Sequence, residues 1–396
     1  MSDIDAQQDF SLVLGGPLFQ LLRRLHLSGD ALELLRQRIL VLLSIIWLPL
    51  LALSKLEGQV WGGRAAVPFL WDIEVNVRFL VAAPLLFVAE LIVHQHMRLV
   101  VRQFLDRNLI PDRALPRFDA AIASAFRLRN SGLAEAVLIV LVYVFGVLIV
   151  WRNFIALSTT VTWYAFPTPE GMALSPTGKW YVFVSLPVFQ FLLMRWYYRV
   201  LIWVRFLWQV SRIELSLIPT HPDRVGGLGF LANVSNAFTV LAVAHGALLA
   251  GLIANRIFYL RAALTDFKAE TAVVVIFVLG LAFGPFLLFA PQLAATKQEG
   301  IREYGTFAER YVREFDSKWV RGRAATANEP LVGSADIQSL ADLDNSFAIV
   351  KTMRVAPITR DALVGLVGAT LAPVVPLALT MMSLEELLKT LFGVLF

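Results

Sequence analysis

The chain has 396 residues, of which 58% are hydrophobic and only 16% are charged, and its formal net charge is +5. Soluble globular domains carry roughly 25% charged residues, so this composition excludes an ordinary soluble domain and predicts an integral membrane protein. The absence of cysteine excludes disulfides, thiolate metal sites and a cysteine nucleophile. Membrane topology accounts for the positive charge, so no nucleic-acid partner is predicted.

Seven apolar segments approach the ~20 residues that a bilayer crossing requires. In chain order they are residues 39–53, 77–93, 133–151, 179–194, 230–253, 271–290 and 362–382. The last one contains Pro373 and Pro376, so it either crosses fully or re-enters the membrane. The sequence therefore predicts an all-α polytopic helical membrane protein with about seven transmembrane helices, which form a single integral membrane domain over residues 1–396.

Most of the 35 lysine and arginine residues lie in alternate loops, which the positive-inside rule places in the cytoplasm together with the N-terminus. The loops concerned, after the arginines that precede the first span, are residues 94–132, 195–229 and 295–360. We expect these segments to be amphipathic cytoplasmic helices that pack as one layer. The leucines of residues 383–396 lie on one helical face and predict an interfacial amphipathic helix.

Aromatic residues and arginines alternate between Arg195 and Trp208, directly after the fourth predicted span. A voltage sensor needs regularly spaced arginines within the apolar span, whereas here the arginines begin where the span ends. We therefore interpret this segment as an interfacial belt, in which the aromatic rings sit at headgroup level and the arginines meet lipid phosphates.

Apolar residues recur at three and four residues between Ile301 and Trp319, which predicts an amphipathic helix over residues 296–321. Its apolar stripe must be buried, either against the protein's own cytoplasmic helices or against a neighbouring subunit in a short coiled-coil seam. The second alternative predicts a homo-oligomer. A further helix is expected over residues 335–353.

An unusual glycine-rich segment, residues 221–230, precedes the fifth predicted span. Three glycines in four positions permit positive φ angles and close backbone approach. The segment is either a tight turn that admits the chain to the membrane or a loop that holds an anionic headgroup, a phosphate or an ion. The residues of such a loop are His221, Asp223, Arg224, Gly226, Gly227 and Gly229.

The pattern HPD-x-x-GGLGF at 221–230, together with ADIQSLADL at 335–343, resembles a family of bacterial polytopic membrane proteins. The resemblance rests on these two short motifs. It implies a multi-pass protein of the bacterial inner (plasma) membrane, and it transfers no mechanism.

Glu90 and His94 lie one helical turn apart near the inner end of the second predicted span, and His96 follows. Carboxylate and imidazole at this spacing form half of a metal site, which His221 and Asp223 would complete from the same side of the membrane. Alternatively, Glu90 pairs with an arginine of a cytoplasmic loop. No cofactor is predicted; the ligands that these residues and the glycine loop would hold are a metal ion or a phospholipid.

His245 lies in the middle of the fifth predicted span, where a titratable group is a functional hypothesis by default. Ala242, Gly246 and Ala250 form a small-residue stripe beside it, along which another helix can approach closely. A neutral histidine that is hydrogen-bonded across that helix interface is the alternative. The residues expected to line a polar path with His245 are Asn233, Asn236, Gln190 and Pro285.

Three functions are compatible with these patterns. The preferred one is an oligomeric channel or transporter for an ion or small solute, because polar and helix-breaking residues lie at membrane depth without a catalytic constellation. The second is a non-catalytic scaffold or sensor whose cytoplasmic face docks a protein partner or anionic lipid. The third is a lipid-active metalloenzyme that uses the residues around Glu90, although the sequence favours a protein that is not an enzyme.

Overall fold

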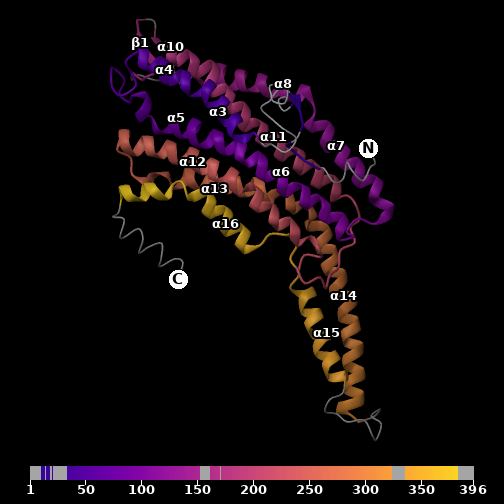
Figure 1. Cartoon of the computed structure of the whole chain (residues 1–396). Coiled ribbons are helices and arrows are strands. Elements are labelled where there is room, and N and C mark those ends of the chain that lie inside the picture. The colour runs from indigo at the N-terminus through magenta and orange to yellow at the C-terminus, as the bar shows by residue number, and fades with distance from the viewer. Residues whose placement is uncertain are drawn as a thin grey trace.

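The structure is a computed structural model that describes residues 10–13, 15–17, 20, 34–151, 161–169, 171–322 and 335–381. It is all-helical, with 77% helix and almost no strand. The helices form an elongated bundle, and one pair of helices projects from an end of it (Figure 1). The predicted all-α class is therefore confirmed, while the helix predicted over residues 383–396 lies outside the described residues.

The main helices follow one another along the bundle in alternating directions (Figure 1). They are α3 (Leu35–Ile46), α4 (Leu48–Leu56), α5 (Ile73–Val77), α6 (Ala83–Asp106), α7 (Leu115–Arg129), α8 (Gly132–Leu141), α10 (Pro176–Trp180), α11 (Leu186–Val210), α12 (Val234–Leu260), α13 (Lys268–Phe283), α14 (Ala290–Phe315), α15 (Ala335–Lys351) and α16 (Arg360–Leu371). The strands β1 (Ala165–Thr168) and β2 (Gly171–Leu174) form an antiparallel hairpin at one end of the bundle.

Several helices are long and apolar enough to cross a membrane, as expected of an integral membrane protein. By length and composition the described residues provide four of them, namely Leu35–Leu56, Ile73–Asp106, Leu228–Leu260 and Leu264–Val320. A fifth candidate is the pair Asp112–Arg129 and Gly132–Val147, which is bent by 49°. These five runs coincide with the first, second, third, fifth and sixth predicted spans.

The count of seven spans is not confirmed: neither the fourth nor the seventh predicted span is among the helices that are both long and apolar enough to cross a membrane. The fourth corresponds to α11, where Gln190, Arg195 and Arg199 lower the apolar content. The seventh corresponds to α16, which has 12 residues and ends at Leu371, two residues before Pro373. An α-helix of 12 residues spans about 18 Å, well short of the ~30 Å hydrocarbon core.

Helix starts are fixed by polar side chains that accept hydrogen bonds from the first free backbone amides. Ser131 caps α8 by accepting from the Ala134 amide at 3.3 Å, and Thr359 caps α16 by accepting from the Ala362 amide at 3.2 Å. Both caps stand directly before apolar segments, so the short polar stretches define where these helices enter the bundle.

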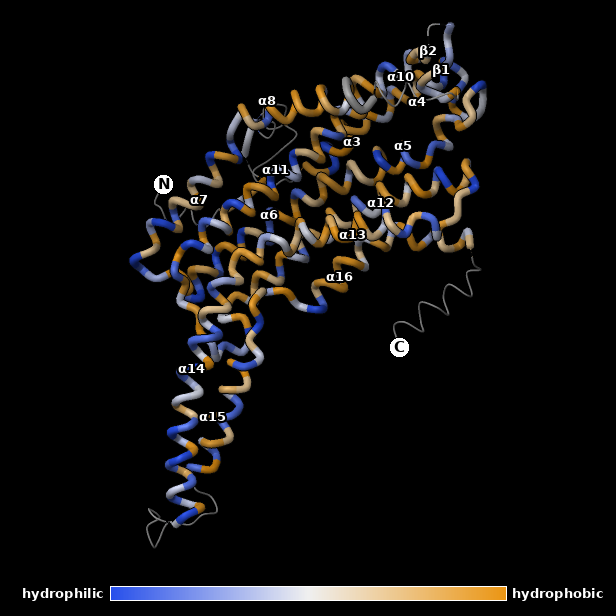
Figure 2. The backbone as a smooth tube through the Cα atoms, turned by 180° about the vertical axis from the view of Figure 1, so that it is seen from behind, coloured by the Kyte–Doolittle hydropathy of each residue, from blue (hydrophilic) through white to orange (hydrophobic). Residues whose placement is uncertain are grey.

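Helix α12 occupies the centre of the bundle and packs against α5, α6, α13 and α16. Gly246 is the closest point: a Cβ atom added there would lie 2.0 Å from the carbonyl oxygen of Thr370 on α16. The small-residue stripe predicted on this helix therefore allows a close helix–helix approach, because the backbone of α16 contacts α12 at Gly246. Figure 2 shows hydrophobic residues concentrated along α12, α13 and α8.

Helices α14 and α15 pair as a hairpin that projects away from the bundle and is more hydrophilic than the bundle (Figure 2). The Tyr311 hydroxyl donates to the Asp336 carbonyl at 3.0 Å, and the Asp336 carboxylate accepts from Lys318 at 2.8 Å and from the Trp319 indole at 2.9 Å. These two donors hold the pKa of Asp336 below its usual value. The apolar stripe of residues 296–321 thus packs on α15 of the same chain.

Candidate functional site

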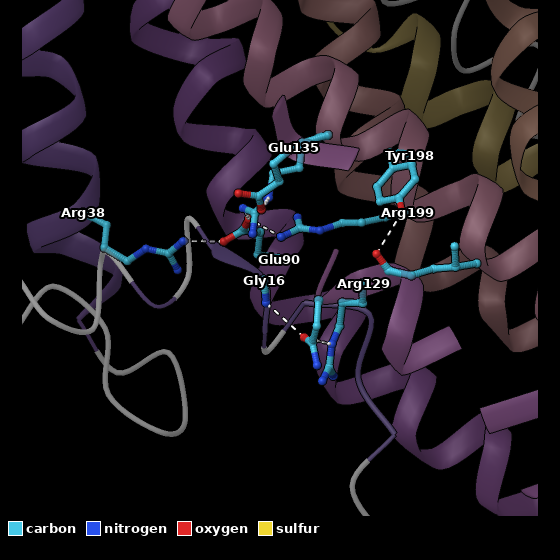
Figure 3. Close-up of polar contacts among 10 residues, drawn as sticks. Gly16, Arg38, Glu90, Arg129, Glu135, Tyr198 and Arg199 are labelled. Atoms are coloured by element: carbon cyan, nitrogen blue, oxygen red, sulfur yellow. Dashed lines mark hydrogen bonds and ion pairs between the residues drawn. The ribbon is translucent and has the colours of Figure 1, made fainter. Parts of the chain in front are cut away.

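The Glu90 carboxylate on α6 is surrounded by three arginines inside the bundle (Figure 3). Arg38 Nη2 on α3 lies 2.5 Å from Oε2, and Arg195 Nη1 on α11 lies 3.2 Å from Oε1. Arg199 lies one helical turn further along α11, and its Nη2 is 2.8 Å from Oε1. This contact is an ion pair, but its N–H is not aligned for a hydrogen bond. One carboxylate therefore faces three guanidinium groups from two other helices.

Glu135 adds a second carboxylate at the start of α8, where the helix dipole favours a negative charge. Its Oε1 lies 3.5 Å from Arg195 Nε. We name the five side chains Arg38, Glu90, Glu135, Arg195 and Arg199 the Glu90 cluster. All five are buried, with side-chain exposures between 1% and 12%, so the cluster is screened from solvent.

The Glu90 cluster holds more positive than negative charge. Its three arginines and two glutamates give a formal charge of +1, because guanidinium stays protonated in proteins. Among the described residues, Arg38 Nε and Nη1 are buried and have no hydrogen-bond partner. Aromatic rings cover two of the guanidinium planes: Phe87 lies 4.6 Å from Arg38 and Trp196 lies 5.0 Å from Arg199.

The burial of Arg195 and Arg199 contradicts the interfacial-belt interpretation for these two residues, whereas Arg205 and Trp208 further along α11 are exposed. Residues four apart lie on the same helical face, and this face of α11 turns into the bundle, where both arginines are about 95% buried. Trp196 is buried beside them and donates to the Leu86 carbonyl at 3.0 Å. The prediction failed because α11 is covered by α6 and α8 at this level, so its arginines meet carboxylates instead of lipid phosphates.

The predicted metal ligands are not brought together. Glu90 is held by arginines, which is the alternative that the sequence left open, although they lie on helices rather than in a loop. His94 Nδ1 lies 2.9 Å from the Ser11 hydroxyl, and His96 Nδ1 lies 2.9 Å from the carbonyl of Ile92 on its own helix. No group of three or more His, Cys, Asp or Glu side chains among the described residues is arranged to hold a metal ion.

The glycine loop folds around its own aspartate. Asp223 Oδ1 accepts from the amides of Val225 at 2.9 Å and Gly227 at 3.2 Å, Oδ2 accepts from the Gly229 amide at 2.8 Å, and His221 Nδ1 lies 2.9 Å from Oδ1. Burial raises the pKa of the Asp223 carboxyl, but the three amides lower it more, so the pKa lies below its usual value. The amides predicted to bind an external anion are therefore occupied by an internal one.

The same loop connects the bundle to the projecting hairpin. The Arg354 amide donates to the Arg224 carbonyl at 2.7 Å, and Arg354 Nη2 donates to the Asp223 carbonyl at 3.1 Å. Gly226 and Gly227 have φ angles of +66° and +100°, and a Cβ on Gly226 would lie 3.3 Å from Met353 Cε. These contacts support the interpretation of the segment as a tight turn at the entry to α12, while the Arg224 side chain is exposed.

His245 makes contacts within the bundle. Its Nδ1 lies 2.7 Å from the Leu241 carbonyl and its Nε2 lies 2.9 Å from the Tyr197 hydroxyl on α11, in agreement with a histidine bonded across a helix interface. Asn233 and Asn236 are exposed on the surface of the chain. The other two residues of the predicted polar path are enclosed elsewhere: Gln190 lies against Gly146, and Pro285 is buried in the turn between α13 and α14.

The sequence carries one signal for this site. A count of charges by loop places Arg38, Arg195 and Arg199 in the cytoplasm, because each follows or precedes an apolar segment. The i,i+4 spacing of Arg195 and Arg199 does predict a common face, and a glutamate at membrane depth needs a partner of opposite charge. Together, these two facts predict that Glu90 pairs with Arg195 and Arg199. The contribution of Arg38 follows only from the three-dimensional structure.

Comparisons of the chain with protein-family models, with curated proteins and with solved structures found no match. The fold itself defines the class: an all-helical protein with four or five helices that could cross a membrane. The Glu90 cluster brings five buried ionisable side chains of the described residues together, and the functional proposal is based on it.

Proposed function

We propose that the protein is a channel or transporter that moves an ion or small solute across the bacterial inner membrane. The observation that carries the proposal is the Glu90 cluster, in which five ionisable side chains are buried between α3, α6, α8 and α11. Ionisable residues within helical membrane proteins are rare, and they commonly mark substrate or ion pathways.

Stability alone does not explain such a cluster. Removing two charges from water costs several kcal/mol per ion, and replacing a buried ion pair by apolar residues of similar volume is often neutral or stabilising. The cluster also leaves Arg38 Nε and Nη1 without partners among the described residues, which adds a further unfavourable contribution. A role in binding a charged solute accounts for both features.

The proposal includes seven spans, with the N-terminus and the arginine-rich end of the bundle in the cytoplasm. Helices α10 and α11 join through the helical segment Tyr181–Ser185 into one run from Pro176 to Val210, which is long enough to cross a bilayer. Helix α16 and the short helix Val375–Thr380 together would form the seventh, interrupted at Pro373. Broken helices of this kind are tolerated in membranes where neighbouring helices cover the backbone.

Flux measurements in proteoliposomes test the proposal. The purified protein should carry at least one small ion or solute from a panel of anions, cations and neutral solutes. Arg199→Gln, which removes one guanidinium from the cluster, should reduce that flux at least about tenfold, equivalent to 1.4 kcal/mol. Arg205→Gln is the matched control, because Arg205 lies on the same helix and is exposed. Absence of flux for every solute, with correctly folded protein, would refute the transport function.

A second candidate function is favoured by the projecting hairpin. Phe307, Val312 and Val320 on α14 and its extension expose 53%, 49% and 71% of their surface, although the hairpin is otherwise hydrophilic. A scaffold that docks a cytoplasmic protein, or a homo-oligomer formed through residues 296–321, would cover these side chains. Phe307→Asp and Val312→Asp should then release the partner or reduce the subunit count, whereas the neighbouring exposed substitution Thr306→Asn should not.

A further inference from the structure

We infer that the Glu90 cluster is a binding site for a small monovalent oxyanion of the carboxylate type, and that Glu90 holds the site as an internal anion when no ligand is bound. This assignment names the class of solute for the proposed transport function. Its physiological meaning rests on that proposed function. Binding itself is independent of transport, so the two proposals can fail separately.

The donor chemistry selects an anion. A guanidinium carries five N–H donors and no acceptor, so three guanidiniums that converge on one point need a hydrogen-bond acceptor, and an anion also compensates their charge. Planar carboxylate oxygens match this geometry and form short, charge-assisted hydrogen bonds. Glu90 presents such a group to Arg38, Arg195 and Arg199 at 2.5, 3.2 and 2.8 Å, which shows the kind of ligand that the three arginines accept.

The charge of the cluster also favours an anionic ligand. Three arginines and two glutamates leave one formal positive charge in a buried environment, where an uncompensated charge is costly. One monovalent anion compensates this charge while both glutamates stay ionised. Arg129, whose charge acts on Arg199, adds further positive charge beside the cluster.

Arg38 supplies the free donors. Only its Nη2 atom contacts Glu90, and its buried Nε and Nη1 atoms have no hydrogen-bond partner among the described residues. Phe87 covers one face of this guanidinium, so a ligand would approach in the guanidinium plane, where the N–H groups point. A ligand on these two donors would lie beside the Glu90 carboxylate, and the two like charges would compete for the same three guanidiniums.

Formate binding tests the inference on the full-length protein in detergent. Sodium formate would replace sodium chloride at constant ionic strength, and binding would be measured by calorimetry and by thermal unfolding. Wild type should show saturable stabilisation by formate. Glu90→Ala should bind formate about tenfold more tightly, because removal of the internal competitor frees the binding-competent state. Arg38→Gln should lose the effect, and Arg36→Gln should keep it, because Arg36 is exposed on the same helix.

Each outcome decides between the alternatives. If formate affects neither wild type nor Glu90→Ala, or if Arg38→Gln binds as wild type does, the inference is overturned. Should Arg38→Gln fail to fold, the comparison of Glu90→Ala with Arg36→Gln still decides, because only the former changes the site. Saturable binding without formate flux in proteoliposomes would support the site and refute transport, whereas formate flux that Arg38→Gln leaves unchanged would support transport and overturn the site.

Discussion

Replacing Gly246 with alanine is expected to force α12 and α16 apart. The new Cβ would lie 2.0 Å from the Thr370 carbonyl oxygen and 2.9 Å from its carbonyl carbon, so the helices must separate by at least 1 Å before this contact reaches 3.0 Å. Overpacking of this kind costs about 1–3 kcal/mol, and here the obstacle is backbone, which cannot rotate away. The higher helix propensity of alanine returns only about 1 kcal/mol.

The expected net effect of Gly246→Ala is therefore a loss of up to about 2 kcal/mol of unfolding free energy, measured by denaturant unfolding in detergent. Gly280→Ala on α13 is the matched control, because a Cβ there meets nothing within 4 Å. It gains the same helix propensity without a clash, so its stability should be unchanged or higher. If Gly246→Ala is as stable as Gly280→Ala, α16 does not cross α12 at this point, and the packing deduced for the seventh predicted span is wrong.

Four further substitutions test the buried charges and the local hydrogen bonds separately. Glu90→Gln should lower the unfolding free energy by about 3–5 kcal/mol, because it leaves buried arginines uncompensated. Glu135→Gln, which weakens the longer contact with Arg195, should lower it by about 1–2 kcal/mol. Equal losses would contradict the central role of Glu90. Asp223→Asn should lower the unfolding free energy at neutral pH. The difference from wild type should shrink as pH falls below about 4, because a carboxyl whose folded pKa is lowered contributes stability that is lost on protonation. A pH-independent difference would contradict the hydrogen bonds from the three loop amides to Asp223. Tyr197→Phe should cost about 1 kcal/mol by unpairing His245 Nε2, and no measurable loss would indicate that the bond is not formed.

The sequence predicted the helical class and the position of five apolar runs, because both follow from local composition and periodicity. The helices at 296–321 and 335–353 were also placed correctly by their patterns, apart from small differences in the end residues. The number of spans remains a prediction: the fourth and seventh segments are interrupted by arginines and prolines, and only their surroundings determine whether lipid or protein covers them.

The functional site was harder to predict because it depends on residues far apart in the chain. Glu90 was singled out, but the sequence paired it with nearby histidines, whereas the structure pairs it with Arg38, 52 residues before it, and Arg199 on α11. Counting arginines by loop assigns each one to a side of the membrane and says nothing about burial. The glycine loop was easier, because the residues that satisfy Asp223 lie within six positions of it.

Two internal carboxylates of this protein show why the Glu90 cluster, and not the glycine loop, is the candidate binding site. Asp223 is satisfied by neutral amides of its own loop, so its negative charge is solvated locally and no buried positive charge remains. Glu90 is satisfied by charged donors from two other helices, which outnumber the carboxylates they face. The Glu90 cluster therefore still attracts an additional anion after its internal contacts are formed, whereas the glycine loop does not. Removing the Glu90 carboxylate would leave a site that an external carboxylate can fill.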